Sequence, residues 1–99
     1  MKKFLLLNQD EEPMFDVQWR EFNCAILELG GGYFVVNVVP KQYGQSYACA
    51  VYRSAGEAAR AVDELNDFAL KVSKPNQAFA FPAVSEEPIS PLEILDTIF

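Results

Sequence analysis

The chain has 99 residues and a formal net charge of −6, with fourteen acidic residues, eight basic residues and no histidine. About half of its residues are hydrophobic (51%), so the chain is long and apolar enough to bury a core, and we expect a single domain over residues 1–99. The negative charge argues against a general binder of nucleic acid or anionic membranes, because such proteins gain affinity from Lys and Arg that neutralise phosphates.

The N-terminal part gives weak signals. Residues 4–7 are apolar and predict a short strand or a tail pressed on the core, and residues 8–13 predict an acidic loop. Phe15, Trp19 and Phe22 are spaced like one face of a helix, but this run is too short to choose between helix and strand.

Targeting signals are equally sparse. Four apolar residues are too few for a signal-peptide core, and no stretch approaches the ~20 apolar residues of a membrane span. We therefore expect a cytoplasmic protein.

Three strands follow in the sequence. Residues 23–29, 33–39 and 46–53 are strand candidates, and 33–39, with four valines and two aromatic residues, gives the strongest signal. Turns around three glycines (30–32) and around Gly44 separate them. Tight turns between successive strands predict an antiparallel meander.

The strongest helix signal covers residues 52–72. Ser54 and Glu57 form a capping box, in which the serine oxygen accepts a hydrogen bond from the Glu57 amide. Beyond it, apolar residues recur at helical spacing and predict a buried stripe made of Ala58, Ala61, Val62, Leu65, Phe68, Ala69 and Val72.

The remaining residues add an extended run and a second helix. Residues 77–81 read as extended, residues 82–88 as a linker, and a second capping box with Pro91 at the first helical position predicts a short helix over about 91–98. The predicted fold class is α+β: an antiparallel meander of three or more strands packed on one long helix, with a short C-terminal helix.

Both faces of the predicted meander are apolar. Residues 33–39 place Phe34, Val36 and Val38 on one face and mainly valines and a tyrosine on the other, and the helix can cover only one of them. The second face needs cover from the chain's own tails, from a second copy of the protein or from another partner.

The sequence lacks the usual catalytic and metal-binding groups. Without histidine, the common general base and the Ser-His and Cys-His pairs are missing, so we expect a protein that is not an enzyme. Cys24 and Cys49 read as buried thiols or as a disulfide between neighbouring strands, and two cysteines without histidine do not predict a zinc site. We expect no metal and no cofactor.

Residues 52–63, read Tyr-Arg-Ser-Ala-Gly-Glu-Ala-Ala-Arg-Ala-Val-Asp, resemble the start of the helix in AP2/ERF-type domains. Residues 80–82 (Ala-Phe-Pro) and 31–33 (Gly-Gly-Tyr) also look like short motifs of that family. The resemblance implies a three-stranded sheet on one helix over about residues 22–82. That family reads DNA with arginines and tryptophans of its sheet, but two such positions fall at Val38 and Ala48 here, so the resemblance does not imply DNA reading.

The functional expectation is therefore a protein that binds another protein. We expect a small acidic inhibitor or adaptor, of the kind that phages use against nucleic-acid-handling machinery such as CRISPR complexes, docking onto a basic groove. The predicted partner-binding residues are the helix acids and two aromatic anchors: Asp63, Glu64, Asp67, Tyr43 and Trp19.

Two alternatives stay open. One is an AP2-like nucleic-acid-binding module that uses Lys41, Arg53 and Lys74. The other is an enzyme subunit or small-ligand binder that uses the apolar sheet face.

Overall fold

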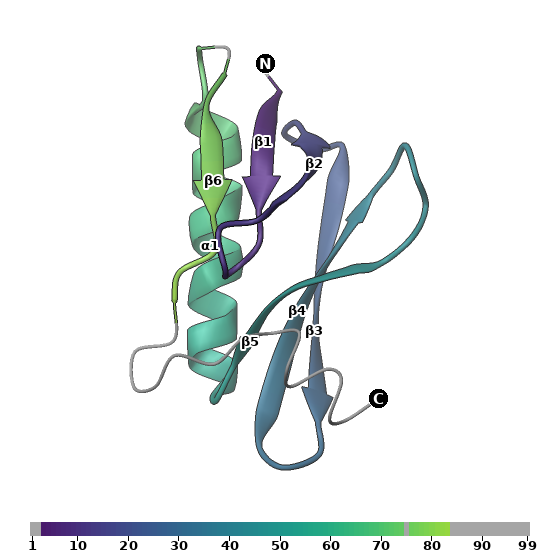
Figure 1. Ribbon diagram of the computed structural model, residues 1–99, viewed down its shortest axis with the longest axis vertical. Helices are drawn as coiled ribbons and strands as arrows, with labels where there is room; N and C mark the ends of the chain where they lie inside the picture. Colours follow the sequence, from purple (N-terminus) through teal and green to yellow (C-terminus); the bar gives the residue numbers. More distant parts are fainter. Residues whose placement is uncertain (1–2, 75, 84–99) are drawn as a thin grey trace.

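The computed structural model describes residues 3–74 and 76–83, which form six strands and one helix (Figure 1). In chain order these are β1 (Phe4–Leu7), β2 (Pro13–Val17), β3 (Phe22–Leu29), β4 (Tyr33–Pro40), β5 (Tyr47–Tyr52), α1 (Ala55–Lys71) and β6 (Ala78–Ala80). The predicted α+β class is confirmed.

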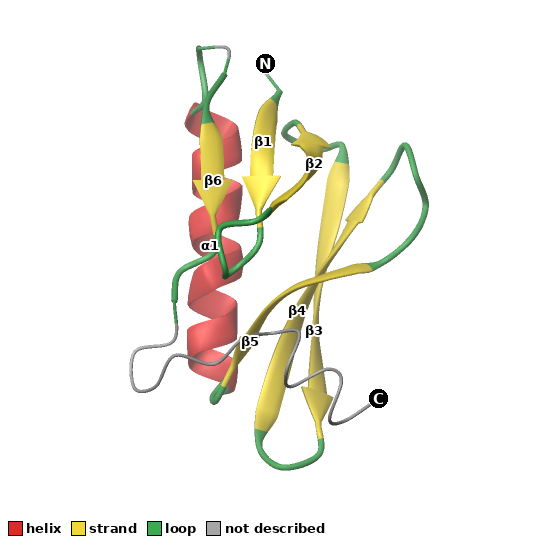
Figure 2. Cartoon of the chain, viewed as in Figure 1, coloured by secondary structure: helices red, strands yellow, loops and turns green. Residues whose placement is uncertain are grey.

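Strands β3, β4 and β5 form an antiparallel meander in that order, as predicted (Figure 2). The β3–β4 hairpin closes with Leu29 opposite Tyr33, and Gly31 and Gly32 between them adopt φ of 83° and 80°. Only glycine takes these angles without steric cost, so the glycine run fixes the turn. We call this sheet the meander sheet.

The other three strands form a second sheet that the sequence did not predict. Its order is β2–β1–β6, with β1 antiparallel to β2 and parallel to β6, and we call it the mixed sheet. The helical spacing of Phe15, Trp19 and Phe22 was misleading, because Phe15 and Val17 are buried while the intervening Asp16 is exposed. Burial that alternates from one residue to the next is typical of a β-strand with one solvent-exposed face.

Helix α1 begins as the capping box predicts, with the Ser54 Oγ accepting from the Glu57 amide at 3.1 Å. It buries Ala58, Ala61, Leu65 and Ala69 in the main core. Figure 1 shows β1 and β6 lying against the helix, and the Phe68 ring contacts Phe4 at 5.0 Å and Phe79 at 5.5 Å between centroids. The helix thus packs on both sheets, and one continuous core joins them.

The two sheets are also joined by hydrogen bonds of one residue, Gln9, in the loop between β1 and β2. Its backbone N–H donates to the Cys49 carbonyl (3.0 Å), and its Oε1 accepts from the Val51 amide (3.1 Å). Its Nε2 donates to the carbonyl of Pro82 (3.2 Å), which also accepts from the Tyr52 hydroxyl at 2.7 Å. Gln9 therefore closes the edge of β5 that faces away from β4 and fixes the segment after β6.

The outer face of the meander sheet is covered unevenly. Val35 and Val51 are 2% and 1% exposed and pack with partly buried Leu29, Tyr33 and Ala48. The N-terminal strand does not lie there, because its Phe4 and Leu6 belong to the main core. What covers this face, a tail or a partner, stays a prediction, and the predicted helix over 91–98 lies outside the described residues.

Within residues 3–74 and 76–83, no helix is both long and apolar enough to cross a membrane.

Replacing Gln9 with alanine should destabilise the fold, because the buried Val51 N–H would lose its acceptor. We expect Gln9→Ala to lower the free energy of unfolding in urea by about 1–3 kcal/mol, the cost of an unsatisfied buried donor. The matched control is Gln42→Ala at an exposed loop position, where we expect a change within about 0.5 kcal/mol. Equal effects of the two substitutions would contradict this role of Gln9.

Candidate functional site

The loop between β4 and β5 projects from the body of the protein, at the upper right of Figure 1. All six of its residues, 41–46, are exposed. The amides of Tyr43 and Gly44 both donate to the Pro40 carbonyl, at 3.2 and 3.0 Å, and Gly44 has φ of 69°. These hydrogen bonds give the loop a defined turn, with Tyr43 at its tip.

Tyr43 is exposed but does not stand alone. Its side chain is 55% exposed, yet its ring lies 6.3 Å from Phe15 and 6.4 Å from Tyr47 between centroids, both edge-on. Phe15 and Tyr47 are 5.0 Å apart, and the Tyr47 hydroxyl donates to Oε1 of Gln45 at 3.1 Å. One part of the Tyr43 ring is held by aromatic contacts, and the rest faces outward.

The turn between β2 and β3 lies beside this loop. The Lys41 amide donates to the Glu21 carbonyl (2.9 Å), and the Glu21 amide donates to the Gln18 carbonyl (3.0 Å). Arg20 adopts φ of 69°, a left-handed conformation that costs a non-glycine residue roughly 1 kcal/mol.

A hollow of about 300 Å³ opens between this turn and helix α1. It is lined by Trp19, Arg20, Phe22, Asn23, Lys41 and Asn66. It combines two aromatic residues, two cations and two amides, so it can offer stacking, positive charge and hydrogen bonds to a ligand or a partner.

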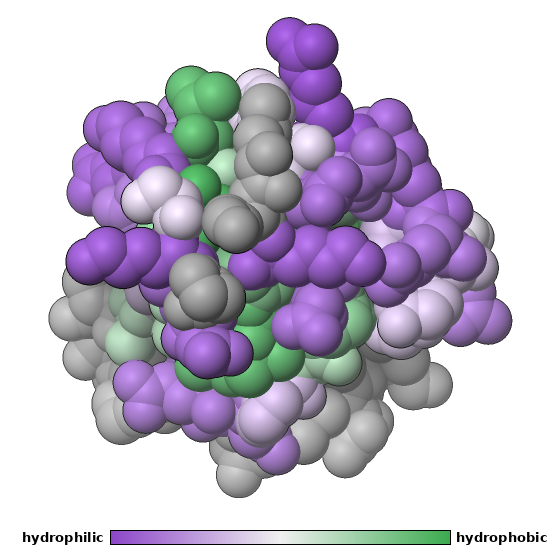
Figure 3. Space-filling model, turned by 90° about the horizontal axis from the view of Figure 1, so that it is seen from above, coloured by the Kyte–Doolittle hydropathy of each residue, from purple (hydrophilic) through white to green (hydrophobic). Residues whose placement is uncertain are grey.

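The structure brings the two predicted aromatic anchors to one end of the protein. Trp19 is half-buried against the main core, and Tyr43 is on the adjacent loop. Seen from above, most of the coloured surface is hydrophilic, and hydrophobic side chains show in the centre and at the upper left (Figure 3).

The three predicted acids of α1, Asp63, Glu64 and Asp67, are all exposed. Asp67 follows Glu64 by three residues and Asp63 by four, so it neighbours both on the helix surface, whereas Asp63 and Glu64 are about 100° apart around the helix axis. Asp63 lies one turn before Asn66, hence on the flank beside the Trp19 hollow. Glu64 lies on the Tyr52 side, and the Lys71 Nζ lies 3.1 Å from an Asp67 carboxylate oxygen.

Sequence reasoning missed Arg20 and Asn66 as members of this site. Neither carries a local signal, because the turn that positions Arg20 and the packing that places Asn66 beside it depend on the whole fold. Lys41 was predicted only as part of the nucleic-acid-binding alternative. Arg53, which was predicted with it, has its guanidinium carbon 5.7 Å from the centroid of the Tyr33 ring.

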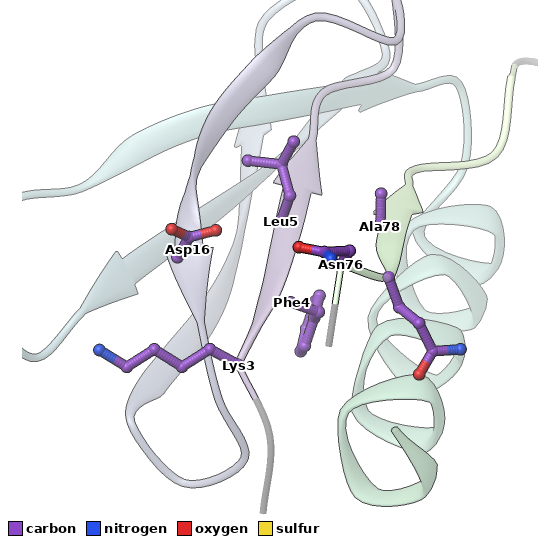
Figure 4. A pocket seen from close by; sticks show the side chains of 7 residues that line it. Lys3, Phe4, Leu5, Asp16, Asn76 and Ala78 are labelled. Carbon is purple, nitrogen blue, oxygen red and sulfur yellow. The ribbon is translucent and has the colours of Figure 1, made fainter. Parts of the chain in front are cut away.

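A larger hollow of about 510 Å³ lies over the mixed sheet (Figure 4). Its lining residues are Lys3, Phe4, Leu5, Asp16, Asn76, Gln77 and Ala78. One lysine, one aspartate and two amides can bind polar groups, but this set contains no nucleophile paired with a base.

The buried ionisable groups have pKa values shifted by desolvation. Burial raises the pKa of the Cys49 thiol from 9.0 to about 12 and that of Cys24 to about 11, and both cysteines are free. Burial, with Glu64 and Glu57 nearby, also raises the pKa of Tyr52. Protonated thiols are poor nucleophiles, so neither cysteine is activated for chemistry.

The described residues show no other mark of a ligand site. In this part of the chain, each buried side-chain nitrogen or oxygen has a hydrogen-bond partner, and no group of three or more Cys, Asp or Glu is placed to hold a metal ion. Comparison with protein-family models, curated proteins and solved structures finds no match.

The shifted thiols predict a loss of stability at alkaline pH. Above pH 9 the thiols of the unfolded chain ionise, while in the folded chain Cys24 stays protonated up to about pH 11 and Cys49 up to about pH 12, so stability falls as the pH rises through this range. We expect urea midpoints to be flat from pH 7 to 8.5 and to decrease above pH 9, with a shallower decrease for Cys49→Ala. Thiolate absorbance of the folded protein that rises with a midpoint near pH 9 would contradict this expectation.

Proposed function

We propose that this protein acts without catalysis by binding another protein through one end, formed by Trp19, Arg20, Lys41, Tyr43 and Asn66. We call this surface the aromatic end. The observation that carries the proposal is the state of Tyr43, which is 55% exposed while its ring is held against Phe15 and Tyr47. Aromatic residues dominate binding hot spots, and an anchor already fixed in place loses little entropy on binding.

Charge suggests what such a partner presents. Arg20 and Lys41 would face carboxylates of the partner, while Asp63 on the neighbouring flank of α1 would face a basic group. The overall charge of −6 would speed association with a basic protein. The most specific form of the proposal is a small acidic inhibitor of nucleic-acid-handling machinery, as the sequence predicts.

A nucleic-acid-binding module is the second candidate. The observation in its favour is the hollow itself, where Trp19 lies with Arg20 and Lys41, because aromatic rings and cations together bind single strands. Against it stand the net charge and the exposed acids of α1.

Tyr43 variants test the protein-binding proposal. A partner is first captured from extract and purified, and its affinity for the wild type and variants is then measured by calorimetry. We expect Tyr43→Ala to weaken binding at least about tenfold, and Tyr43→Phe to bind nearly as the wild type does. The control is Leu70→Ala on α1, a side chain of matched exposure (54%), which should leave the affinity unchanged. Equal affinities of Tyr43→Ala and wild type would refute the role of Tyr43.

Charge reversal tests the acidic surface separately. Reversing Glu64 and Asp67 to lysine should slow association with a basic partner and reduce its salt dependence. An unchanged association rate would remove these acids from the proposal.

Mobility shift with single- and double-stranded DNA at low salt separates the two candidates. The proposal expects no shift. A salt-sensitive shift that Lys41→Glu abolishes would contradict it and favour the nucleic-acid module.

A further inference from the structure

The described chain has four strands at sheet edges: β2 and β6 in the mixed sheet, and β3 and β5 in the meander sheet. An edge strand presents unpaired N–H and C=O groups, which another strand can bind unless the edge is shortened, bent or covered. The four edges differ sharply in this respect.

Three edges carry such protection. Strand β6 has only three residues, and β2 begins at Pro13, close to a register shift between Leu6 and Leu7. The register of the β4–β5 pairing shifts between Val36 and Asn37. On the edge of β5 away from β4, Gln9 is hydrogen-bonded to the Cys49 carbonyl and to the Val51 amide.

Among the residues that the structure describes, nothing protects strand β3 in this way. It is eight residues long, and its pairing with β4 is regular throughout. It contains no lysine, arginine or proline, and Glu28 is its only charged residue. Ile26 and Leu27 are 37% and 49% exposed, and none of the backbone hydrogen bonds found outside regular elements of the described residues involves 23–29.

We propose that two copies of this protein pair through β3, antiparallel about a two-fold axis at Ile26, to form a continuous six-stranded sheet. This inference goes beyond the proposed function and does not depend on Tyr43. A two-fold pair uses the one open edge found among the described strands of each copy, so assembly stops at the dimer instead of growing into a filament.

The register follows from size and charge. Centred on Ile26, the pairing places Leu27 opposite Ala25 of the second copy, a large side chain against a small one on the same face. Glu28 then lies opposite Cys24 of the second copy, and the two Glu28 carboxylates are separated by four residues, or about 13 Å along the strands. At 0.1 M salt their repulsion is largely screened at this separation. Centring the axis on Leu27 or Glu28 would bring the two carboxylates closer together.

Sedimentation equilibrium across a concentration series tests the dimer. We expect the wild type to dimerise and Leu27→Lys to be monomeric, because lysine charges an edge strand and blocks pairing. The control is Leu70→Lys, which adds the same charge at similar exposure on α1 and should dimerise as the wild type does. A wild type that stays monomeric up to about 1 mM, or a dimer that Leu27→Lys leaves unchanged, would overturn the proposal.

Cysteine cross-linking tests the register and does not depend on how the lysine variant folds. In a Cys24→Ser background, Ile26→Cys places two thiols directly opposite each other across the axis, within reach of a disulfide. We expect mild oxidation to give a covalent dimer with Ile26→Cys and little with Leu70→Cys. Equal yields from the two variants would overturn the register.

Discussion

The fold depends on the side chain of one buried residue, Gln9, which satisfies backbone groups from two distant parts of the chain. Its amide oxygen accepts from Val51, and its amide nitrogen donates to the Pro82 carbonyl. Without it, the N–H of Val51, a residue only 1% exposed, would lie buried and unpaired. The N-terminal strands are thereby held against the meander sheet by polar contacts as well as by the shared core.

This connection positions the surfaces that carry the two proposals. Gln9, in the loop between β1 and β2, is hydrogen-bonded to β5. The Phe15 ring of β2 contacts Tyr47 and Tyr43, so the loop tip gains its fixed aromatic ring. Because Gln9 covers the edge of β5, β3 is left as the one long and regular open edge of the described strands. Binding at the aromatic end and pairing at β3 would therefore use different parts of the protein.

The features that the sequence predicted are those with local causes. The capping box at Ser54, the stripe of α1 and the glycine turn before Tyr33 are each determined within a few residues, and all are present. The mixed sheet was missed because its parallel pairing joins β1 to β6, more than 70 residues apart, and no local pattern encodes such a contact.

In the candidate site, too, features with local causes were predictable and those that depend on packing were not. Turn chemistry predicted an exposed Tyr43, but the approach of Arg20 and Asn66 to Trp19 requires the packed fold. The exposure of Asp63, Glu64 and Asp67 on the outer surface of α1 follows from the position of the apolar stripe and was predictable, and their role in binding stays a prediction.

The most direct test of this account is amide hydrogen exchange at Val51. If Gln9 closes the edge of β5, the Val51 amide exchanges slowly in the wild type, and Gln9→Ala accelerates it at least about tenfold while the amides of α1 change only as much as global stability does. A Val51 amide that exchanges rapidly in the wild type, or that keeps its protection in Gln9→Ala, would contradict the central role of Gln9.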